Sequence, residues 1–163
     1  MKEIICSQLS LEGIKGLGRY SSLLDCAGEC AGKDLIQFFP DLLQYSYNGP
    51  QPSFSVVECR KREMLITEAE QHFYASEALL PLNGDVVIFV APASKDIFPT
   101  DKVKAFIVPM GTMVILNEGV WHKAPFPIDK PVVNSLVVLP TLTYINDCRI
   151  VSLKDSQWMK IAI

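Results

Sequence analysis

The sequence predicts an all-β sandwich or barrel that carries a short N-terminal helix. Two observations support this fold class. From residue 35 onward, short apolar or alternating segments follow one another, and turn-forming residues separate them. At 163 residues the chain has the size of one domain, and no internal repeat divides it. We therefore expect a single domain over residues 1–163.

The N-terminal part has a different pattern. Apolar residues recur at roughly helical spacing between residues 10 and 24, although Gly13, Gly16 and Gly18 would each weaken a helix interior by about 1 kcal/mol. We expect a short helix and then a turn in this stretch. Residues 26–34 are small and glycine-rich, which predicts a loop.

Ten segments are predicted strands: residues 35–39, 42–47, 53–60, 65–70, 76–81, 86–91, 104–108, 112–116, 135–139 and 148–152. The predicted joints are Asn48-Gly49-Pro50, Asn83-Gly84-Asp85, Pro109-Met110-Gly111 and Asn117-Glu118-Gly119. Asn83-Gly84 lies between two apolar runs and predicts a tight hairpin, because a type I′ turn needs positive φ at both central residues.

Charge and cysteine content exclude several classes of protein. The net charge is −3 and the basic residues are scattered, so neither a nucleic-acid surface nor a basic membrane-binding stripe is indicated. No apolar run approaches the about 18 residues that cross a bilayer, and the first residues contain no signal-peptide core. The five cysteines show no C-x-x-C spacing, which argues against a disulfide framework. We expect a cytoplasmic protein with reduced thiols.

Two segments contain the candidate chemistry. The first reads Glu70-Gln71-His72, four residues, Glu77, six residues, Gly84; the second reads Gly111, five residues, Asn117-Glu118-Gly119, two residues, His122. Residues two apart on a strand face the same way, so Glu70 and His72 should project together. A turn at residues 73–75 would bring Glu77 back beside them, and His122 would complete a convergent polar cluster.

These segments resemble the two sequence motifs of the cupin superfamily. Those motifs read H-x-H, three or four residues, E, six residues, G, and then G, five residues, P-x-G, two residues, H. Here Glu70 replaces the first histidine and Asn117 replaces the proline. The resemblance implies a cupin-type β-barrel, also called a double-stranded β-helix or jelly roll. It also implies a site for a divalent metal (Mn, Fe, Ni or Zn), with a metal-free site as the alternative. The implied metal ligands are Glu70, His72, Glu77 and His122.

A closer resemblance is to the ureidoglycolate lyase family, which cleaves ureidoglycolate to glyoxylate and urea in allantoin and purine breakdown. It rests on Glu68-Ala69-Glu70-Gln71-His72, Ala78-Leu79-Leu80-Pro81-Leu82-Asn83-Gly84 and Gly119-Val120-Trp121-His122. Four positions depart from that pattern: Gln71 replaces an arginine, Glu77 replaces a glutamine, and Lys123-Ala124 replaces a histidine-proline pair. Because these exchanges lie in or beside the site, they bear on the substrate more than on the fold.

The resemblance implies roles for individual residues. His72 or His122 would be the base, and Glu77 would orient it or protonate the departing urea. A cation from Lys123, Arg60 or Arg62 would hold the substrate carboxylate. Trp121, with Tyr74, would form a flat wall of the site.

Two other functions stay open. One is a metal-dependent cupin isomerase or epimerase acting on a sugar or sugar acid, and the other is a non-catalytic cupin that binds a small molecule. The expected partner in each case is a small molecule, and for the lyase a carboxylate substrate. A homodimer formed through the apolar segment 132–142 is a further hypothesis.

Overall fold

The computed structural model describes residues 1–28, 30–33, 35–45 and 49–163. Its strands are β1 Lys2–Gln8, β2 Gly18–Ser22, β3 Ala31–Lys33, β4 Ile36–Phe38, β5 Pro52–Arg60, β6 Leu65–Ile66, β7 Glu68–Gln71, β8 Glu77–Pro81, β9 Val86–Val90, β10 Lys104–Val108, β11 Thr112–Leu116, β12 Phe126–Pro127, β13 Val132–Pro140, β14 Arg149–Ser152 and β15 Met159–Ala162. The helices are α1 Leu11–Ile14, α2 Thr143–Asn146 and a 3₁₀ turn, Asp155–Gln157. The all-β prediction is confirmed.

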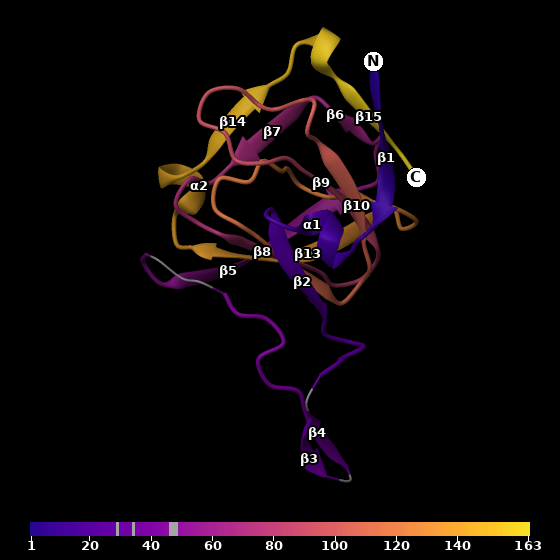
Figure 1. Cartoon of the computed structure of the whole chain (residues 1–163), viewed down its shortest axis with the longest axis vertical. Coiled ribbons are helices and arrows are strands. Elements are labelled where there is room, and N and C mark those ends of the chain that lie inside the picture. Colours follow the sequence, from indigo (N-terminus) through magenta and orange to yellow (C-terminus); the bar gives the residue numbers. More distant parts are fainter. Residues whose placement is uncertain (29, 34, 46–48) are drawn as a thin grey trace.

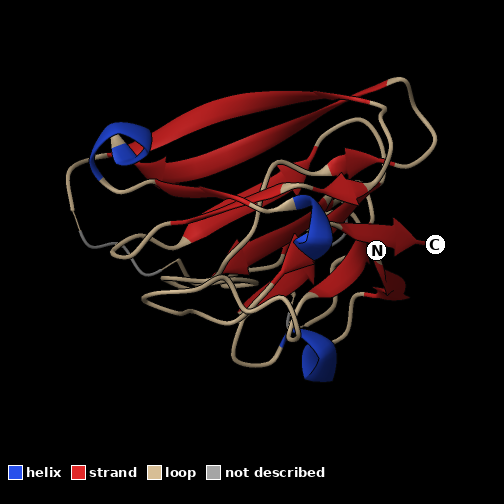
Figure 2. Ribbon diagram, turned by 90° about the horizontal axis from the view of Figure 1, so that it is seen from above, coloured by secondary structure: helices blue, strands red, loops and turns tan. Residues whose placement is uncertain are grey.

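Two sheets form the body of the molecule (Figure 1). One has six strands in the order β12-β9-β10-β1-β15-β6, and the other has five in the order β2-β11-β8-β13-β5. Figure 2 shows strands of the two sheets lying over one another. Apolar side chains from both sheets meet in one core cluster, in which Leu79 and Val114 of the second sheet pack with Ile88 and Phe106 of the first. This packing gives the sheets their inner faces.

The N-terminal region contains less helix and more strand than expected. Helix α1 is a single turn, whose N-cap Ser10 accepts a hydrogen bond from the Gly13 amide at 3.1 Å. The next residues form β2, which pairs with β11. A side chain at Gly18 would overlap the carbonyl oxygen of Ile115, so this glycine permits the strand pairing. Strands β1 and β15, which pair with each other, were also not expected.

Residues 26–45 depart from the prediction in two places. The expected loop includes β3, which pairs with β4 in a small hairpin that projects away from the two sheets (Figure 1). The strand expected over residues 42–47 is wrong for residues 42–45, which form no strand. Its remaining residues, 46 and 47, and Asn48 of the next predicted turn lie outside the described residues.

The predicted hairpin at Asn83-Gly84 is wrong. Strand β8 pairs with β11 and β13, whereas β9 pairs with β10 and β12, so this turn carries the chain from one sheet to the other. Neither residue has positive φ. The space beside this glycine is tight, because a Cβ at Gly84 would lie 3.0 Å from Val133 Cγ2. Asn83 Oδ1 also accepts the Asn134 amide at 2.8 Å.

The segment proposed as a dimer edge is also interior. Strand β13 pairs with β8 on one side and β5 on the other, so its hydrogen-bonding edges are already used. No helix in the described part of the chain is long and apolar enough to cross a membrane.

Candidate active site

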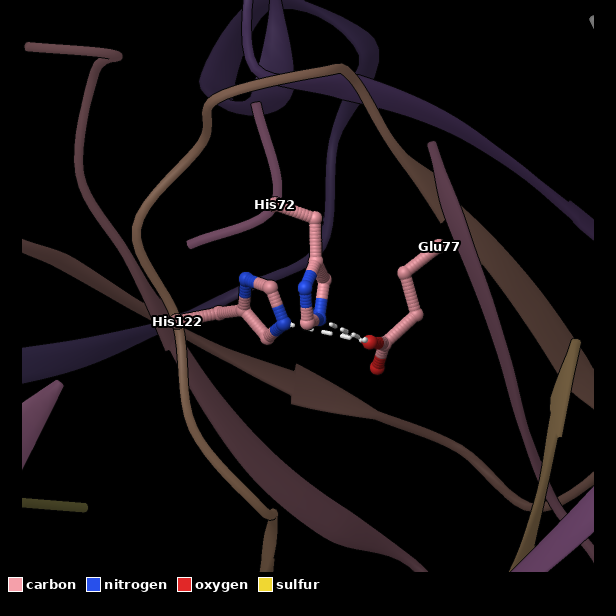
Figure 3. A group of neighbouring side chains, drawn as sticks. All are labelled: His72, Glu77 and His122. Carbon is pink, nitrogen blue, oxygen red and sulfur yellow. Dashed lines mark hydrogen bonds and ion pairs between the residues drawn. The ribbon is translucent and has the colours of Figure 1, made fainter. Parts of the chain in front are cut away.

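Three side chains from separate segments meet between the sheets (Figure 3). His72 follows β7, Glu77 begins β8, and His122 lies between β11 and β12. The Nε2 atoms of both histidines lie 3.2 Å from the same oxygen, Glu77 Oε2. His72 and His122 are buried, and 12% of the Glu77 side chain is exposed. These are three of the four residues expected to converge, the fourth being Glu70.

Main-chain hydrogen bonds hold the three segments together. Glu70 and His122 form an antiparallel bridge, in which the Glu70 amide donates to the His122 carbonyl at 2.7 Å and the reverse bond is 2.9 Å long. The Gly119 amide donates to the His72 carbonyl at 2.6 Å, and Gly119 itself has φ of 74°. The turn glycine of the second motif is therefore bonded directly to the first motif.

Both imidazole rings are oriented by backbone carbonyls. The distance from His72 Nδ1 to the carbonyl oxygen of Asp147 is 2.6 Å, and that from His122 Nδ1 to the carbonyl oxygen of Val120 is 2.9 Å. A carbonyl oxygen only accepts hydrogen bonds, so each Nδ1 carries a proton and donates it. In the neutral rings the lone pair is then on Nε2, which faces Glu77. Histidines that bind metals in proteins are held in this way.

Asp147 also fixes the turn that joins His72 to Glu77. Its Oδ1 accepts the Phe73 amide at 2.7 Å and its Oδ2 accepts the Tyr74 amide at 2.8 Å. One residue therefore orients the His72 ring with its carbonyl and the following turn with its carboxylate. Nothing in the local sequence around Asp147 predicts this contact, which spans more than seventy residues.

The histidine and carboxylate charges stabilise each other. Burial disfavours a charged Glu77, but the His122 charge and hydrogen bonds from both histidines hold the pKa of this carboxyl well below its usual range. Burial likewise opposes a charged His122, but Glu77 and the Val120 carbonyl raise the pKa of His122 to about 9. At neutral pH the metal-free site therefore holds an ion pair.

The same atoms fit a metal. Two imidazole nitrogens and one carboxylate oxygen lie within 4.8 Å of one another, and this donor set suits Mn, Fe, Ni or Zn. Glu70, expected as a fourth ligand, is outside this group. Its Oε2 accepts a hydrogen bond from Lys123 Nζ at 2.9 Å.

The cluster opens into a cavity of about 340 Å³. Strands of both sheets, helix α2 and the segment after His122 line this cavity. The lining residues are Ser55, Val56, Val57, Glu70, His72, Glu77, Leu79, Ile88, Leu116, His122, Lys123, Ala124, Pro125, Val137, Leu139, Tyr144 and Cys148.

Three residues expected to bind substrate are not among the lining residues. Trp121 is fully buried on the other side of its segment, where its Nε1 donates to Ser94 Oγ at 2.7 Å and its ring packs edge-on against Phe98. Tyr74 is 78% exposed. Arg60 is exposed at the surface beside Glu58. These three expectations are corrected.

Of the other two cations expected to bind substrate, Lys123 lines the cavity and Arg62 does not. Arg62 donates to the carbonyl oxygens of Ala124 and Pro125 at 3.0 and 3.1 Å, so it supports one wall of the cavity from behind. Lys123 lines the cavity as expected. Burial works against its charge, but hydrogen bonding to Glu70 and the charges of Glu70 and Glu68 raise its pKa.

Cys148 and Tyr144 are two of the lining residues that the sequence did not identify. Cys148 Sγ lies 3.9 Å from Glu70 Oε2, and burial together with the Glu70 charge raises the pKa of this thiol. Tyr144, on α2, shares a 3.1 Å hydrogen bond with Ser55 Oγ. Both follow β13 in the chain, and no motif identifies them.

Comparison with known proteins gives a family and a fold. A protein-family model described as ureidoglycolate lyase matches residues 39–160, a stretch that includes His72, Glu77 and His122. A search of curated proteins found no match.

Among solved structures, a dTDP sugar isomerase from Desulfovibrio desulfuricans G20 matches with a TM-score of 0.51 and 10% identity, over 86% of this chain and 87% of that chain. The dTDP-4-dehydrorhamnose 3,5-epimerase from Elizabethkingia anophelis NUHP1 matches with a TM-score of 0.46 and 10% identity, over 64% of this chain and 58% of that chain. RmlC from Streptococcus suis, in complex with dTDP-D-xylose, matches with a TM-score of 0.40 and 11% identity, over 55% of this chain and 44% of that chain. The chain spans about half the length of the last two. At 10% identity the likeness to the isomerase shows the fold alone, and that fold is the cupin jelly roll.

Proposed function

Because the chain belongs to the ureidoglycolate lyase family, we propose that it is a lyase that cleaves the carbon–nitrogen bond of a small 2-hydroxy carboxylate. The observation that supports this most is the joining of His72, Glu77 and His122 beside a cavity of about 340 Å³. The family's own substrate, ureidoglycolate, is the first compound to test. The corresponding setting would be purine-nitrogen breakdown in the cytoplasm.

We assign His72, Glu77 and His122 as the residues that hold a divalent metal. When bound, such a metal would polarise substrate oxygen atoms and stabilise negative charge on them. Lys123 would bind the substrate carboxylate, since it is the cation among the described residues that line the cavity. Glu70, hydrogen-bonded to Lys123, would take the proton of the substrate hydroxyl.

A metal-free assignment uses the same residues differently. His72 would then take the hydroxyl proton through Nε2, because its Nδ1 is already bonded to a carbonyl. His122, whose pKa is raised to about 9, is already protonated at neutral pH. Glu77 would orient the ring that acts as the base. The two assignments differ in whether glyoxylate release depends on added metal.

The direct test is glyoxylate release from ureidoglycolate by the purified protein, with and without added Mn²⁺, Fe²⁺, Ni²⁺ or Zn²⁺. Glu77→Gln should lower the rate at least about a hundredfold, because it removes the charge shared by both histidines. Glu118→Gln, at an exposed position, is the matched control and should keep the rate. Absence of release under every metal condition would refute the assignment of this substrate.

The sugar isomerase or epimerase and the non-catalytic binding protein stay predictions. The mixed nitrogen and oxygen donor set is compatible with the isomerase. Turnover of a sugar acid without glyoxylate release would favour that function, and saturable binding without turnover would favour the binding protein. A homodimer also stays a prediction, which a molar-mass measurement in solution would test.

A further inference from the structure

Most of the cavity wall is apolar. The charged and titratable groups next to the cluster form one connected set, because Glu70 bonds to Lys123 and Cys148 through its side chain and to His122 through its backbone. Apart from this set, the described lining is largely hydrocarbon. Its apolar residues are Val56, Val57, Leu79, Ile88, Leu116, Ala124, Pro125, Val137 and Leu139.

The strand register places this apolar surface directly beside Glu77. Leu116 on β11 is the pairing partner of Glu77, so the two side chains lie on the same face of the sheet. Leu79, two residues along β8, also shares that face. Leu79 pairs with Val137 on β13, which extends the apolar surface across a third strand. A substrate bound at Glu77 therefore has hydrocarbon beside it on both sides.

This surface suits an apolar substituent better than a ureido group. The carbamoyl end of a ureido group has two N–H donors on its terminal nitrogen and one carbonyl acceptor. Each of these needs a hydrogen-bond partner when it leaves water. Outside the connected polar set, the described lining offers the hydroxyls of Ser55 and Tyr144. These two share a hydrogen bond of 3.1 Å, which leaves a single hydroxyl hydrogen for the ureido carbonyl and only oxygen lone pairs for the two N–H donors.

We propose that the substrate is a 2-hydroxyglycine whose nitrogen carries an apolar acyl chain in place of the carbamoyl group of ureidoglycolate. This inference rests on the proposed lyase function. The C–N bond breaks and its electron pair passes to nitrogen, which takes up a proton. The hydroxyl loses its proton as the C=O bond forms. The products are glyoxylate and the apolar amide.

The test uses unreactive analogues that lack the hydroxyl group. Binding of N-carbamoylglycine and of N-acetyl-, N-butyryl- and N-hexanoylglycine is measured by titration calorimetry, on the protein as purified and after addition of Mn²⁺. Each methylene buried against the apolar wall should tighten binding roughly fourfold. N-acetylglycine and N-carbamoylglycine have nearly the same size, and N-acetylglycine should bind more tightly than N-carbamoylglycine. A flat series, or tightest binding of N-carbamoylglycine, would overturn the proposal.

A matched pair of variants locates the effect. Val137→Thr keeps the side-chain shape but puts a hydroxyl into the apolar wall, and should remove most of the gain per methylene. Val132→Thr, on the same strand but outside the lining, should keep the gain. Thermal unfolding checks that both variants fold, and Val57→Thr on β5 replaces Val137→Thr if that variant does not. A gain per methylene unchanged in every lining variant would count against the proposal.

Glyoxylate assays with ureidoglycolate and N-hexanoyl-2-hydroxyglycine test the lyase function and the apolar acyl site separately. Faster release from the hexanoyl compound would support both. A rising binding series with no release from either compound would overturn the lyase function and leave the apolar acyl site supported. Efficient release from ureidoglycolate with a flat binding series would overturn the apolar acyl site alone.

Discussion

His72 and His122 each donate an Nδ1 hydrogen to a backbone carbonyl, and this leaves both Nε2 atoms directed at one carboxylate oxygen. The two carbonyls belong to Asp147 and Val120, which come from different parts of the chain. Backbone carbonyls hold both rings, and the Asp147 carboxylate also fixes the turn that follows His72. The site is therefore preorganised for a ligand at Nε2.

Asp147 should be important for the position of His72. Asp147→Ala removes the acceptors of the Phe73 and Tyr74 amides, so we expect a loss of about 1–3 kcal/mol in unfolding free energy and metal binding about 10–100-fold weaker. Denaturant unfolding and metal titration measure the two effects. Asp129→Ala, at an exposed position, is the control. Equal behaviour of the two variants would contradict the role of Asp147.

Metal binding should depend on pH through His122. A metal must displace the His122 proton, and the charge of Glu77 raises that pKa to about 9, so the proton is still bound at pH 7. Apparent affinity should therefore rise about tenfold per pH unit up to about pH 9 and then level off. Titrations between pH 6.5 and 9.5 measure the slope. A plateau that begins near pH 7 would mean that the histidine has its ordinary pKa.

The sequence could identify the three central residues but not their surroundings. Alternation along a strand predicts only that Glu70 and His72 share a face, whereas the turn after His72 and the two motifs indicate Glu77 and His122. The same rule shows why Trp121 is not in the cavity, because adjacent residues on an extended segment point to opposite sides. Asp147 joins the site through contacts distant in sequence, for which no local pattern exists.

At the scale of elements, local signals predicted strands well and their connections poorly. The turn at Asn83-Gly84 has the composition of a hairpin, but turn composition does not determine which sheet the next strand joins. Similarly, Gly13, Gly16 and Gly18 act only as helix-weakening residues in the sequence pattern. In the structure Gly18 allows β2 to pair closely with β11. Such requirements come from packing between segments.

Gly18 gives an element-scale prediction. Gly18→Ala would push a methyl group into the Ile115 carbonyl, a backbone atom that cannot turn aside, so we expect a loss of about 2 kcal/mol or more. Gly16 has φ of 78°, and a Cβ added there would have no neighbour within 4 Å. Gly16→Asn should therefore cost less, because asparagine tolerates that conformation. Chemical denaturation of both variants measures the two losses in unfolding free energy. Equal losses would contradict the steric account.

At the scale of the whole molecule, the site brings together side chains from three segments of the chain. A metal held by His72, Glu77 and His122 would link the end of β7, the start of β8 and the segment before β12. Ligand binding to the folded state alone stabilises that state. At a metal concentration of 100 times Kd, we expect about 2.7 kcal/mol of added stability. Thermal unfolding should show a higher Tm with Mn²⁺ or Zn²⁺, reversed by a chelator.

The control for this shift is again a pair of variants. Glu77→Gln should abolish the increase in Tm, whereas Glu118→Gln should keep it, since Glu118 is an exposed residue outside the cluster. An increase of equal size in both variants would place the metal elsewhere on the protein.

The most direct test of the account is the amount of divalent metal that the protein retains after dialysis, measured by elemental analysis. We predict about one equivalent per chain in the wild type and in Glu118→Gln, and its loss in Glu77→Gln, His72→Ala and His122→Ala. A wild-type protein that retains no metal after incubation with Mn²⁺, Fe²⁺, Ni²⁺ and Zn²⁺, or variants that retain as much as the wild type, would contradict a metal site at His72, Glu77 and His122.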